Sequence, residues 1–182
     1  MKKLIHGGQL QQVAKNSKIP IEQWLDLSTG ISPLSYPIPE IPSNIWQELP
    51  EPSMSLITAA KNYYGTNTLI ATSGSQSIIS KLPLLCYQHL GNQLKVWLPK
   101  VGYKEHEKAW RDHGYHIHHY HDLPEPHEIV EKCVLIVINP NNPSGKLYNH
   151  STLSKLLKAI ENKGGWLVID EAFMDVISPS QT

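Results

Sequence analysis

The chain has 182 residues, which is enough for one domain with a substantial core. Apolar residues make up 40% of it and charged residues 18%, a balance typical of a folded globular protein rather than a disordered one. Sixteen basic residues stand against sixteen acidic ones, so the charge pattern indicates neither a nucleic-acid groove nor binding to an anionic membrane surface.

Three features indicate the cellular compartment. In the N-terminal stretch MKKLIHGGQLQQ, polar residues follow before any apolar core of a signal peptide is complete. No apolar run approaches the roughly 18 residues that a membrane-spanning helix needs. Cys86 and Cys133 lie far apart beside apolar residues, which is typical of buried thiols in a reducing compartment. We therefore expect a cytoplasmic protein.

Residues 1–53 are expected to form an irregular N-terminal arm. A short helix is predicted over residues 9–16, and the segment from Ser32 to Pro52 is rich in proline, which favours an extended and winding backbone. Such an arm needs a surface to lie against, either the body of the domain or a partner subunit.

From residue 54 to residue 182, predicted helices and strands alternate. Apolar residues at helical spacing predict helices, the second with a kink at Pro83, over residues 53–65, 75–91, 103–114 and 151–165. Short apolar runs predict strands over residues 68–73, 94–99, 115–121, 133–140 and 166–170. This alternation predicts a three-layer α/β domain with a mainly parallel sheet.

In open parallel sheets, ligands bind beyond the carboxyl ends of the strands. The sequence TSGSQS follows one predicted strand and opens a helix, so Gly74, the free amides of the helix start and the hydroxyls of Ser73, Ser75 and Ser77 form a candidate phosphate site. Alternatively, Ser73 or Ser75 simply caps the helix. The sequence alone leaves both interpretations open.

The stretch NPNNPSGK, from Asn139 to Lys146, leaves the most apolar strand and turns sharply. Its two prolines fix the backbone, and Gly145 permits a positive φ. An ordinary turn is one interpretation. The other is that an asparagine amide, held still by the prolines, donates a hydrogen bond to a ligand oxygen.

The last predicted strand ends in two acids, Asp170 and Glu171. A carboxylate at the edge of a core requires a partner, because leaving it unpaired costs free energy. The magnesium-binding acid of a P-loop NTPase is one alternative, but the required G-x-x-x-x-G-K-[ST] motif does not precede it.

Two further histidine-containing stretches stay ambiguous. The run HGYHIHHYH, from His113 to His121, permits metal binding. However, no aspartate, glutamate or cysteine lies at a spacing that would complete a metal site. We therefore favour a polar surface strand and predict no metal. The stretch HGGQ, from His6 to Gln9, either caps the first helix or exposes backbone amides to an anionic substrate.

Several motifs together resemble one family. In chain order from residue 6 to residue 175, they are HGGQL, WLDLSTGISP, GSQSII, PKVGYKEHEKAW, NPNNPSG and VIDEAFMD. They resemble the fold-type-I enzymes that use pyridoxal 5′-phosphate, in the branch of histidinol-phosphate aminotransferases and, more closely, L-threonine-O-3-phosphate decarboxylases. NPNNPSG with DEAF is specific for the superfamily. HGG, LSTGISP and Phe173 in place of the commoner tyrosine indicate the decarboxylase branch.

The resemblance implies a role for each motif. Gly74, Ser75 and Gln76 would hold the cofactor phosphate. Tyr103 would stack on the pyridine ring, Asn142 would donate to its phenolic oxygen, and Asp170 would pair with the protonated ring nitrogen. The substrate-binding residues implied are His6, Gly7, Gly30 and Asn142.

The activity implied is pyridoxal-phosphate-dependent decarboxylation of L-threonine O-3-phosphate, a small phosphorylated amino acid, to (R)-1-amino-2-propanol O-2-phosphate in cobalamin biosynthesis. A histidinol-phosphate-type aminotransferase is the alternative, because the orientation of the substrate decides which bond at the α-carbon breaks. The family also implies a homodimer that uses the proline-rich arm, although Leu49 stands where relatives often carry a tyrosine that reaches the neighbouring subunit.

The sequence departs from the family at its C-terminal end. The family's Schiff-base lysine lies on a loop that would follow Thr182, and Lys146, Lys155, Lys158 and Lys163 do not occupy its place. The small C-terminal domain of the family would also lie beyond this point. The expectation is therefore a truncated large domain, inactive by itself. A split gene, a fragment, a non-catalytic remnant and a subunit that needs a second polypeptide remain alternatives.

Overall fold

The structure is a computed structural model that describes residues 7–32, 34–49, 51 and 53–177. The chain divides into two compact units, Met1–Tyr64 and Gly65–Thr182, and each is described by itself. The sequence-based boundary between residues 53 and 54 stays a prediction. Within the described residues, no helix has both the length and the apolar character required to cross a membrane.

The first unit contains two α-helices, α1 (Leu10–Ser17) and α2 (Met54–Tyr64), and two short 3-10 helices, η1 (Ile21–Gln23) and η2 (Ser43–Trp46). The helices predicted over residues 9–16 and 53–65 are therefore confirmed. Ala14 is the only buried residue among those described in this unit. The arm thus has almost no core of its own, because proline-rich extended backbone brings few side chains together.

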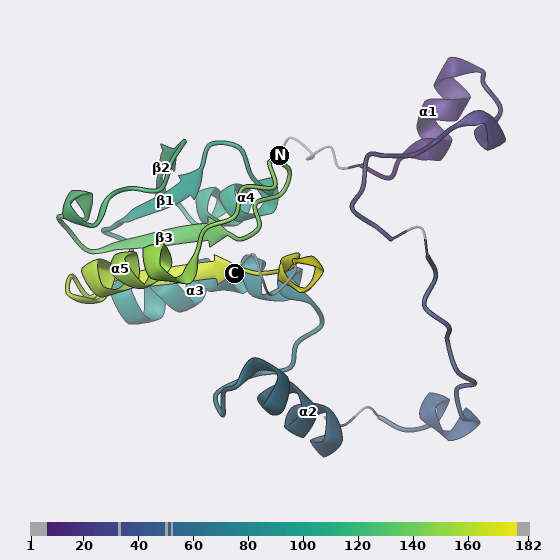
Figure 1. The fold of residues 1–182 in the computed structure, drawn as a ribbon, viewed down its shortest axis with the longest axis horizontal. Coiled ribbons are helices and arrows are strands. Elements are labelled where there is room, and N and C mark those ends of the chain that lie inside the picture. The colour runs from purple at the N-terminus through teal and green to yellow at the C-terminus, as the bar shows by residue number, and fades with distance from the viewer. Residues whose placement is uncertain (1–6, 33, 50, 52, 178–182) are drawn as a thin grey trace. The chain divides into compact units, whose positions relative to one another are not determined.

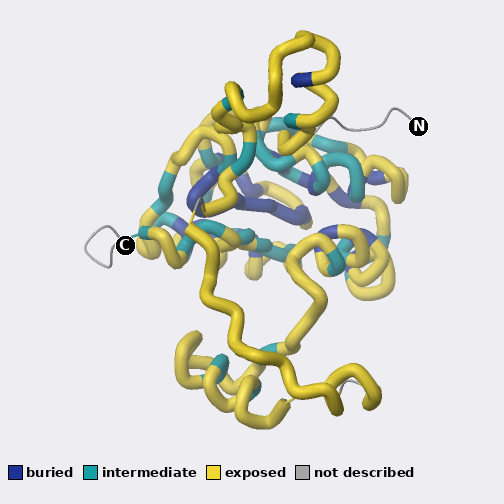
Figure 2. Tube along the Cα trace, turned by 90° about the vertical axis from the view of Figure 1, so that its right-hand side faces the viewer, coloured by how far each residue is buried: buried dark blue, intermediate teal, exposed yellow. Residues whose placement is uncertain are grey.

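The second unit is built on four parallel strands. They are β1 (Lys95–Pro99), β2 (His116–Tyr120), β3 (Cys133–Ile138) and β4 (Trp166–Asp170). Their order in the sheet is β2-β1-β3-β4, with Val96 opposite both Ile117 and Val134 (Figure 1). Every described residue of β3 is buried, as expected of an apolar central strand (Figure 2).

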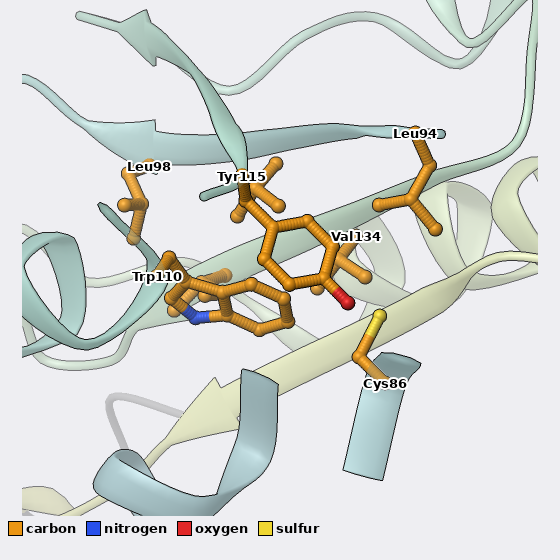
Figure 3. Packing of buried hydrophobic residues seen from close by; sticks show 8 residues of the cluster. Cys86, Leu94, Leu98, Trp110, Tyr115 and Val134 are labelled. Carbon is orange, nitrogen blue, oxygen red and sulfur yellow. The ribbon is translucent and has the colours of Figure 1, made fainter. Parts of the chain in front are cut away.

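Helices cover both faces of this sheet. On one face, α3 (Ser75–Leu90) and α4 (Lys104–Asp112) contribute Cys86 and Trp110 to a core that includes Tyr115 and Val134 (Figure 3). On the other face, α5 (His150–Glu161) packs its Leu153, Leu156 and Ile160 against the sheet. Two short 3-10 helices, η3 (Pro126–Glu128) and η4 (Met174–Val176), complete the unit. The predicted three-layer α/β fold is confirmed.

One predicted strand is wrong. Residues 68–73 contain no β-strand in the structure, and the side chain of Ile70 is 86% exposed. The β-branched and apolar residues of this segment favour extended backbone, but a strand also requires a hydrogen-bonded neighbour. None of the four described strands pairs with this segment. Local preference was therefore not sufficient to form a strand here.

The tight connection between α5 and β4 leads to a first prediction. A Cβ at Gly165 would lie 2.2 Å from the backbone oxygen of Cys133, whereas a Cβ at Gly164, which has a φ of +69°, would meet nothing within 4 Å. Cys133 belongs to the central strand β3, whose backbone cannot shift without a large cost in free energy. We expect Gly165→Ala to lower the free energy of unfolding by about 3 kcal/mol or more, and Gly164→Ala by only about 1 kcal/mol. Urea denaturation of both variants measures the difference, and equal losses would contradict it.

Candidate active site

The loops at the carboxyl ends of three strands meet at one edge of the sheet. The last residues of β3 and β4, Ile138 and Asp170, lie opposite each other in register. The next residue after β3, Asn139, donates its backbone N–H to the carbonyl oxygen of Asp170 at 2.8 Å. The asparagine-rich turn and the acid of the last strand are therefore neighbours, although some thirty residues of sequence separate them.

The carboxylate of Asp170 is paired inside the protein. Its Oδ2 lies 2.9 Å from Nε2 of His106, and the two side chains are 11% and 2% exposed. Its Oδ1 accepts the backbone N–H of Ala172 at 3.1 Å. The hydrogen bond with His106 holds the pKa of Asp170 below its usual value, although burial acts in the opposite direction. Asp170 is therefore a largely but not fully buried anion.

Tyr103 connects the first turns of two helices beside this carboxylate. It precedes α4 as its N-cap residue, and its phenol donates to Oε1 of Gln76 at 3.2 Å. Gln76 in turn donates through Nε2 to Glu105 at 3.4 Å. Burial raises the pKa of Tyr103, and the nearby carboxylates of Glu105 and Asp170 raise it further. The phenol stays neutral at physiological pH, and its half-buried ring offers a flat surface next to Asp170.

The start of α3 keeps its backbone donors available. Gly74 is the N-cap residue, with a φ of 91°, and no side chain accepts a hydrogen bond from the first turn. The interpretation that Ser73 or Ser75 caps this helix is therefore wrong. The backbone N–H groups of Ser75 and Gln76 belong to the first four of the helix, which have no acceptor within it. A helix start of this kind favours a bound anion.

The three asparagines of the turn after β3 have different tasks. Asn139 exchanges two hydrogen bonds with the backbone of Tyr148, and Asn141 donates to the carbonyl of Val101 and to Ser144. Both are buried and hold the turn in place. Asn142 is half-buried, and its side chain has no hydrogen-bond partner among the described residues. Of the three amides, that of Asn142 is free for a ligand.

Among the described residues, two of the predicted substrate-binding positions, Gly7 and Gly30, lie in the first unit. The backbone at Gly7 contacts Ser28 so closely that an added Cβ would be 1.9 Å from its carbonyl oxygen, and the N–H of Gly8 donates to its hydroxyl at 2.9 Å. Gly7 and Gly8 thus pack on Ser28, two residues before Gly30. His6 lies outside the described residues. The roles of His6, Gly7 and Gly30 stay predictions.

The histidines of β2 are used for packing and ion pairing. His118 packs against Trp97 with the rings tilted by 57° and their centroids 4.1 Å apart, and Nε2 of His119 lies 3.2 Å from the carboxylate of Glu107. Over the described ranges, no group of three or more histidines, cysteines or acids has a geometry that would hold a metal ion. These contacts are those of a partly exposed strand beside a helix.

Sequence reasoning missed His106. His106 lies three positions after Tyr103, so both are at the first turn of α4. Their two rings are nearly perpendicular, in an edge-to-face arrangement with centroids 6.4 Å apart. A signal was present, because a histidine at this place belongs to the apolar face of α4 that also carries Trp110. Nothing in the sequence indicated that its partner would be 64 residues away.

Comparison with known proteins identifies the family. Residues 48–182 match the family described as aminotransferase class I and II, and this range is well over half of the chain. The chain belongs to this family, and its parallel sheet, the helix start with free backbone amides and the acid at the end of β4 agree with that assignment.

Two curated relatives carry a more specific name. The threonine-phosphate decarboxylase of Pseudomonas aeruginosa is 38% identical over 172 residues, which cover 94% of this chain and 50% of the relative. The threonine-phosphate decarboxylase of a Sinorhizobium species is 32% identical over 177 residues, covering 95% of this chain and 51% of the relative. The chain thus spans about half the length of the curated relatives that it matches.

Solved structures share the fold. The histidinol-phosphate aminotransferase of Clostridium acetobutylicum is 26% identical, with a TM-score of 0.55 over 70% of this chain and 39% of that structure. Aminotransferase AspB of Helicobacter pylori has a TM-score of 0.59 at 16% identity, over 93% of this chain and 43% of that structure, and it shows the fold alone.

Proposed function

We propose that this chain supplies the cofactor-binding half of an enzyme that decarboxylates L-threonine O-3-phosphate to (R)-1-amino-2-propanol O-2-phosphate with pyridoxal 5′-phosphate. The observation that carries the proposal is the largely buried carboxylate of Asp170, which lies at the end of β4 and close to the ring of Tyr103. The two threonine-phosphate decarboxylases at 38% and 32% identity support the choice of substrate.

The residues present fit pyridoxal phosphate. The uncapped start of α3 at Gly74, Ser75 and Gln76 has free backbone donors for the phosphate. Asp170 uses only two of its roughly four lone-pair positions, one for His106 and one for the N–H of Ala172, so it can accept a further N–H. When bound, the cofactor supplies an electron sink for the charge that develops at the substrate's α-carbon.

Each side chain has a defined task in this proposal. Asp170 keeps the proton on the ring nitrogen, since a charge pair about 4 Å apart gains roughly 4 kcal/mol at an effective dielectric of about 20. Tyr103 packs its face against the ring and fixes the ring plane. Asn142 donates its unused amide to the cofactor or the substrate. Gly7 and Gly30, together with His6, would bind the substrate.

The alternative activity is that of a histidinol-phosphate-type aminotransferase, which the likeness to the solved Clostridium enzyme supports. Both reactions would use the same cofactor-binding residues and would differ in which bond at the substrate's α-carbon breaks. The higher identity to the two decarboxylases favours decarboxylation. A non-catalytic role of the isolated chain is a third candidate, since the chain spans about half the length of the curated relatives that it matches.

A joined chain tests the proposed function. The 182-residue protein is fused to the half of the Pseudomonas decarboxylase that it does not match, and threonine phosphate is supplied with pyridoxal phosphate. We expect carbon dioxide release that needs no 2-oxo acid acceptor. The unfused 182-residue protein is the control and should give no turnover. Release that depends on a 2-oxo acid would favour the aminotransferase, and turnover by the unfused protein would show that no second half is needed.

The proposal extends to location and partners. Cys86 and Cys133 are both buried free thiols, which is consistent with a cytoplasmic enzyme. The substrate would be a small phosphorylated amino acid, and we propose neither nucleic acid nor membrane as a partner. The homodimer implied by the family remains part of this proposal.

A further inference from the structure

The sheet divides at the edge that carries the candidate site. Strand β1 stays paired with β2 up to its last residue, Pro99, and β3 stays paired with β4 up to its last residue, Ile138. The pairing of β1 with β3 ends earlier in the described sheet, at Trp97 and Leu135. From β1 the chain continues to β2 and from β3 to β4, on opposite sides of this division. Open parallel sheets bind ligands at such a switch point.

Two groups of the proposed site come from opposite sides of the switch point. The loop after β1 leads to Tyr103, and the turn after β3 leads to Asn142. Both are assigned to one ring, so their spacing decides whether they can act together. A misplacement of about 1 Å can cost about 100-fold in rate. Since the backbone pairing of β1 with β3 has already ended, another contact has to set this spacing.

The side chain of Asn141 supplies such a contact. It is 8% exposed, and its Nδ2 donates to the carbonyl oxygen of Val101 at 3.0 Å and to Oγ of Ser144 at 2.6 Å. A carbonyl oxygen can only accept, so the nitrogen of the amide has to face Val101. The bond to Ser144 stays within the turn after β3. The bond to Val101 crosses the switch point and ties this turn to the loop after β1.

The loop after β1 packs tightly on the same asparagine. A Cβ added at Gly102 would lie 3.1 Å from Cδ1 of Ile138 and 3.3 Å from Oδ1 of Asn141. This Oδ1 is buried and has no hydrogen-bond partner among the described residues. A buried amide oxygen without a partner costs free energy. The stability of the turn therefore does not by itself account for an asparagine at this position.

Neighbouring asparagines have tasks that do not cross the switch point. Asn139 exchanges hydrogen bonds with the backbone of Tyr148, which follows the same turn. Asn149 caps α5, because its side chain accepts a backbone N–H of the first turn at 2.9 Å. Asn141 differs from both, since its partner Val101 belongs to the loop that follows another strand.

We propose that Asn141 is a positioning residue, which fixes the spacing between Tyr103 and Asn142 by tying the turn after β3 to the loop after β1. Asn141 directly precedes Asn142, and Val101 lies two residues before Tyr103, so the link is close to both groups. The proposal rests on the proposed function, in that the ring between the two groups is taken to be that of pyridoxal phosphate. The phosphate site at the start of α3 is not part of the link, so ring binding and phosphate binding should respond differently.

The first measurement compares two probes by equilibrium dialysis with the 182-residue protein. One is inorganic phosphate. The other is 4′-deoxypyridoxine 5′-phosphate, which has the ring and the phosphate of the cofactor but no aldehyde, so its binding requires no lysine. We expect Asn141→Ala to weaken binding of the ring probe at least tenfold and that of phosphate less than twofold. Gly102→Ala, which displaces the loop after β1 and leaves the amide in place, should give the same pattern.

The second measurement needs no ligand. Backbone ¹⁵N relaxation should show that the order parameters at residues 101–102 fall from about 0.85, the value of rigid backbone, to below about 0.6 in Asn141→Ala. Asn149→Ala is the matched control, because it removes an asparagine that stabilises α5 through its cap. It should leave probe binding and these order parameters unchanged. Circular dichroism confirms that each variant folds.

Each outcome decides the proposal. If Asn141→Ala bound the ring probe as tightly as the unchanged protein, or lost affinity for both probes equally, the positioning role would be overturned. Residues 101–102 that stay rigid in Asn141→Ala would overturn the link itself. If the unchanged protein bound phosphate but not the ring probe, the proposed function would be contradicted, and the order parameters would still decide whether Asn141 links the two loops.

Discussion

Asp170→Asn is expected to reduce decarboxylation of threonine phosphate by the joined chain about 100- to 1,000-fold, because about 3 to 4 kcal/mol of charge pairing with the cofactor ring is lost. The substitution preserves the size of the side chain, and its remaining oxygen can still accept from His106. The loss should therefore appear in kcat and in cofactor affinity rather than in folding. Steady-state kinetics and equilibrium dialysis with pyridoxal phosphate measure it.

The matched control for this variant is Asp112→Asn. Asp112 is a carboxylate of similar chemistry that forms an exposed pair with Lys108 at the end of α4. Exposed pairs of this kind contribute little to stability, so this variant should retain nearly full activity. If Asp170→Asn bound the cofactor as tightly as the unchanged protein, the assignment of Asp170 to the ring nitrogen would be wrong.

His106→Ala is expected to lower the free energy of unfolding at pH 7 by about 2 to 3 kcal/mol, because a buried carboxylate is left without its partner. His106→Gln should recover part of this loss, since its amide can donate to Asp170. The exposed His116 is the control position, and His116→Ala should cost less than about 0.5 kcal/mol. Urea denaturation of the four proteins provides the comparison.

The effect of His106→Ala depends on pH in a defined direction. The hydrogen bond with His106 lowers the pKa of Asp170 in the folded state below its unfolded value. This contribution to stability is fully present above the unfolded pKa, near 3.9, and is lost as the pH falls through the lower folded pKa. The difference between the unchanged protein and His106→Ala should thus be constant from pH 5 upward and shrink below about pH 4. A difference that grows as the pH falls would contradict the role assigned to the pair.

Local patterns in the sequence located most elements correctly. The apolar run at residues 133–138 and the helical spacing of Leu153, Leu156 and Ile160 gave correct predictions, because burial of one face or stripe dominates the energetics of such segments. The strand predicted over residues 68–73 was wrong, since a β-strand needs a hydrogen-bonded neighbouring strand and the local sequence does not reveal one. The uncapped helix start at Gly74 was foreseen as one of two interpretations, and geometry excluded the other.

The sequence by itself determined the layered fold and the acid at the end of β4, because each depends on residues that are close together in the chain. Only the tertiary structure decided which partner the acid has and which amide is free. Packing brings together His106 and Asp170, which are 64 residues apart in the sequence. The side-chain amides of Asn139 and Asn141 donate to nearby backbone carbonyl oxygens, whereas that of Asn142 does not.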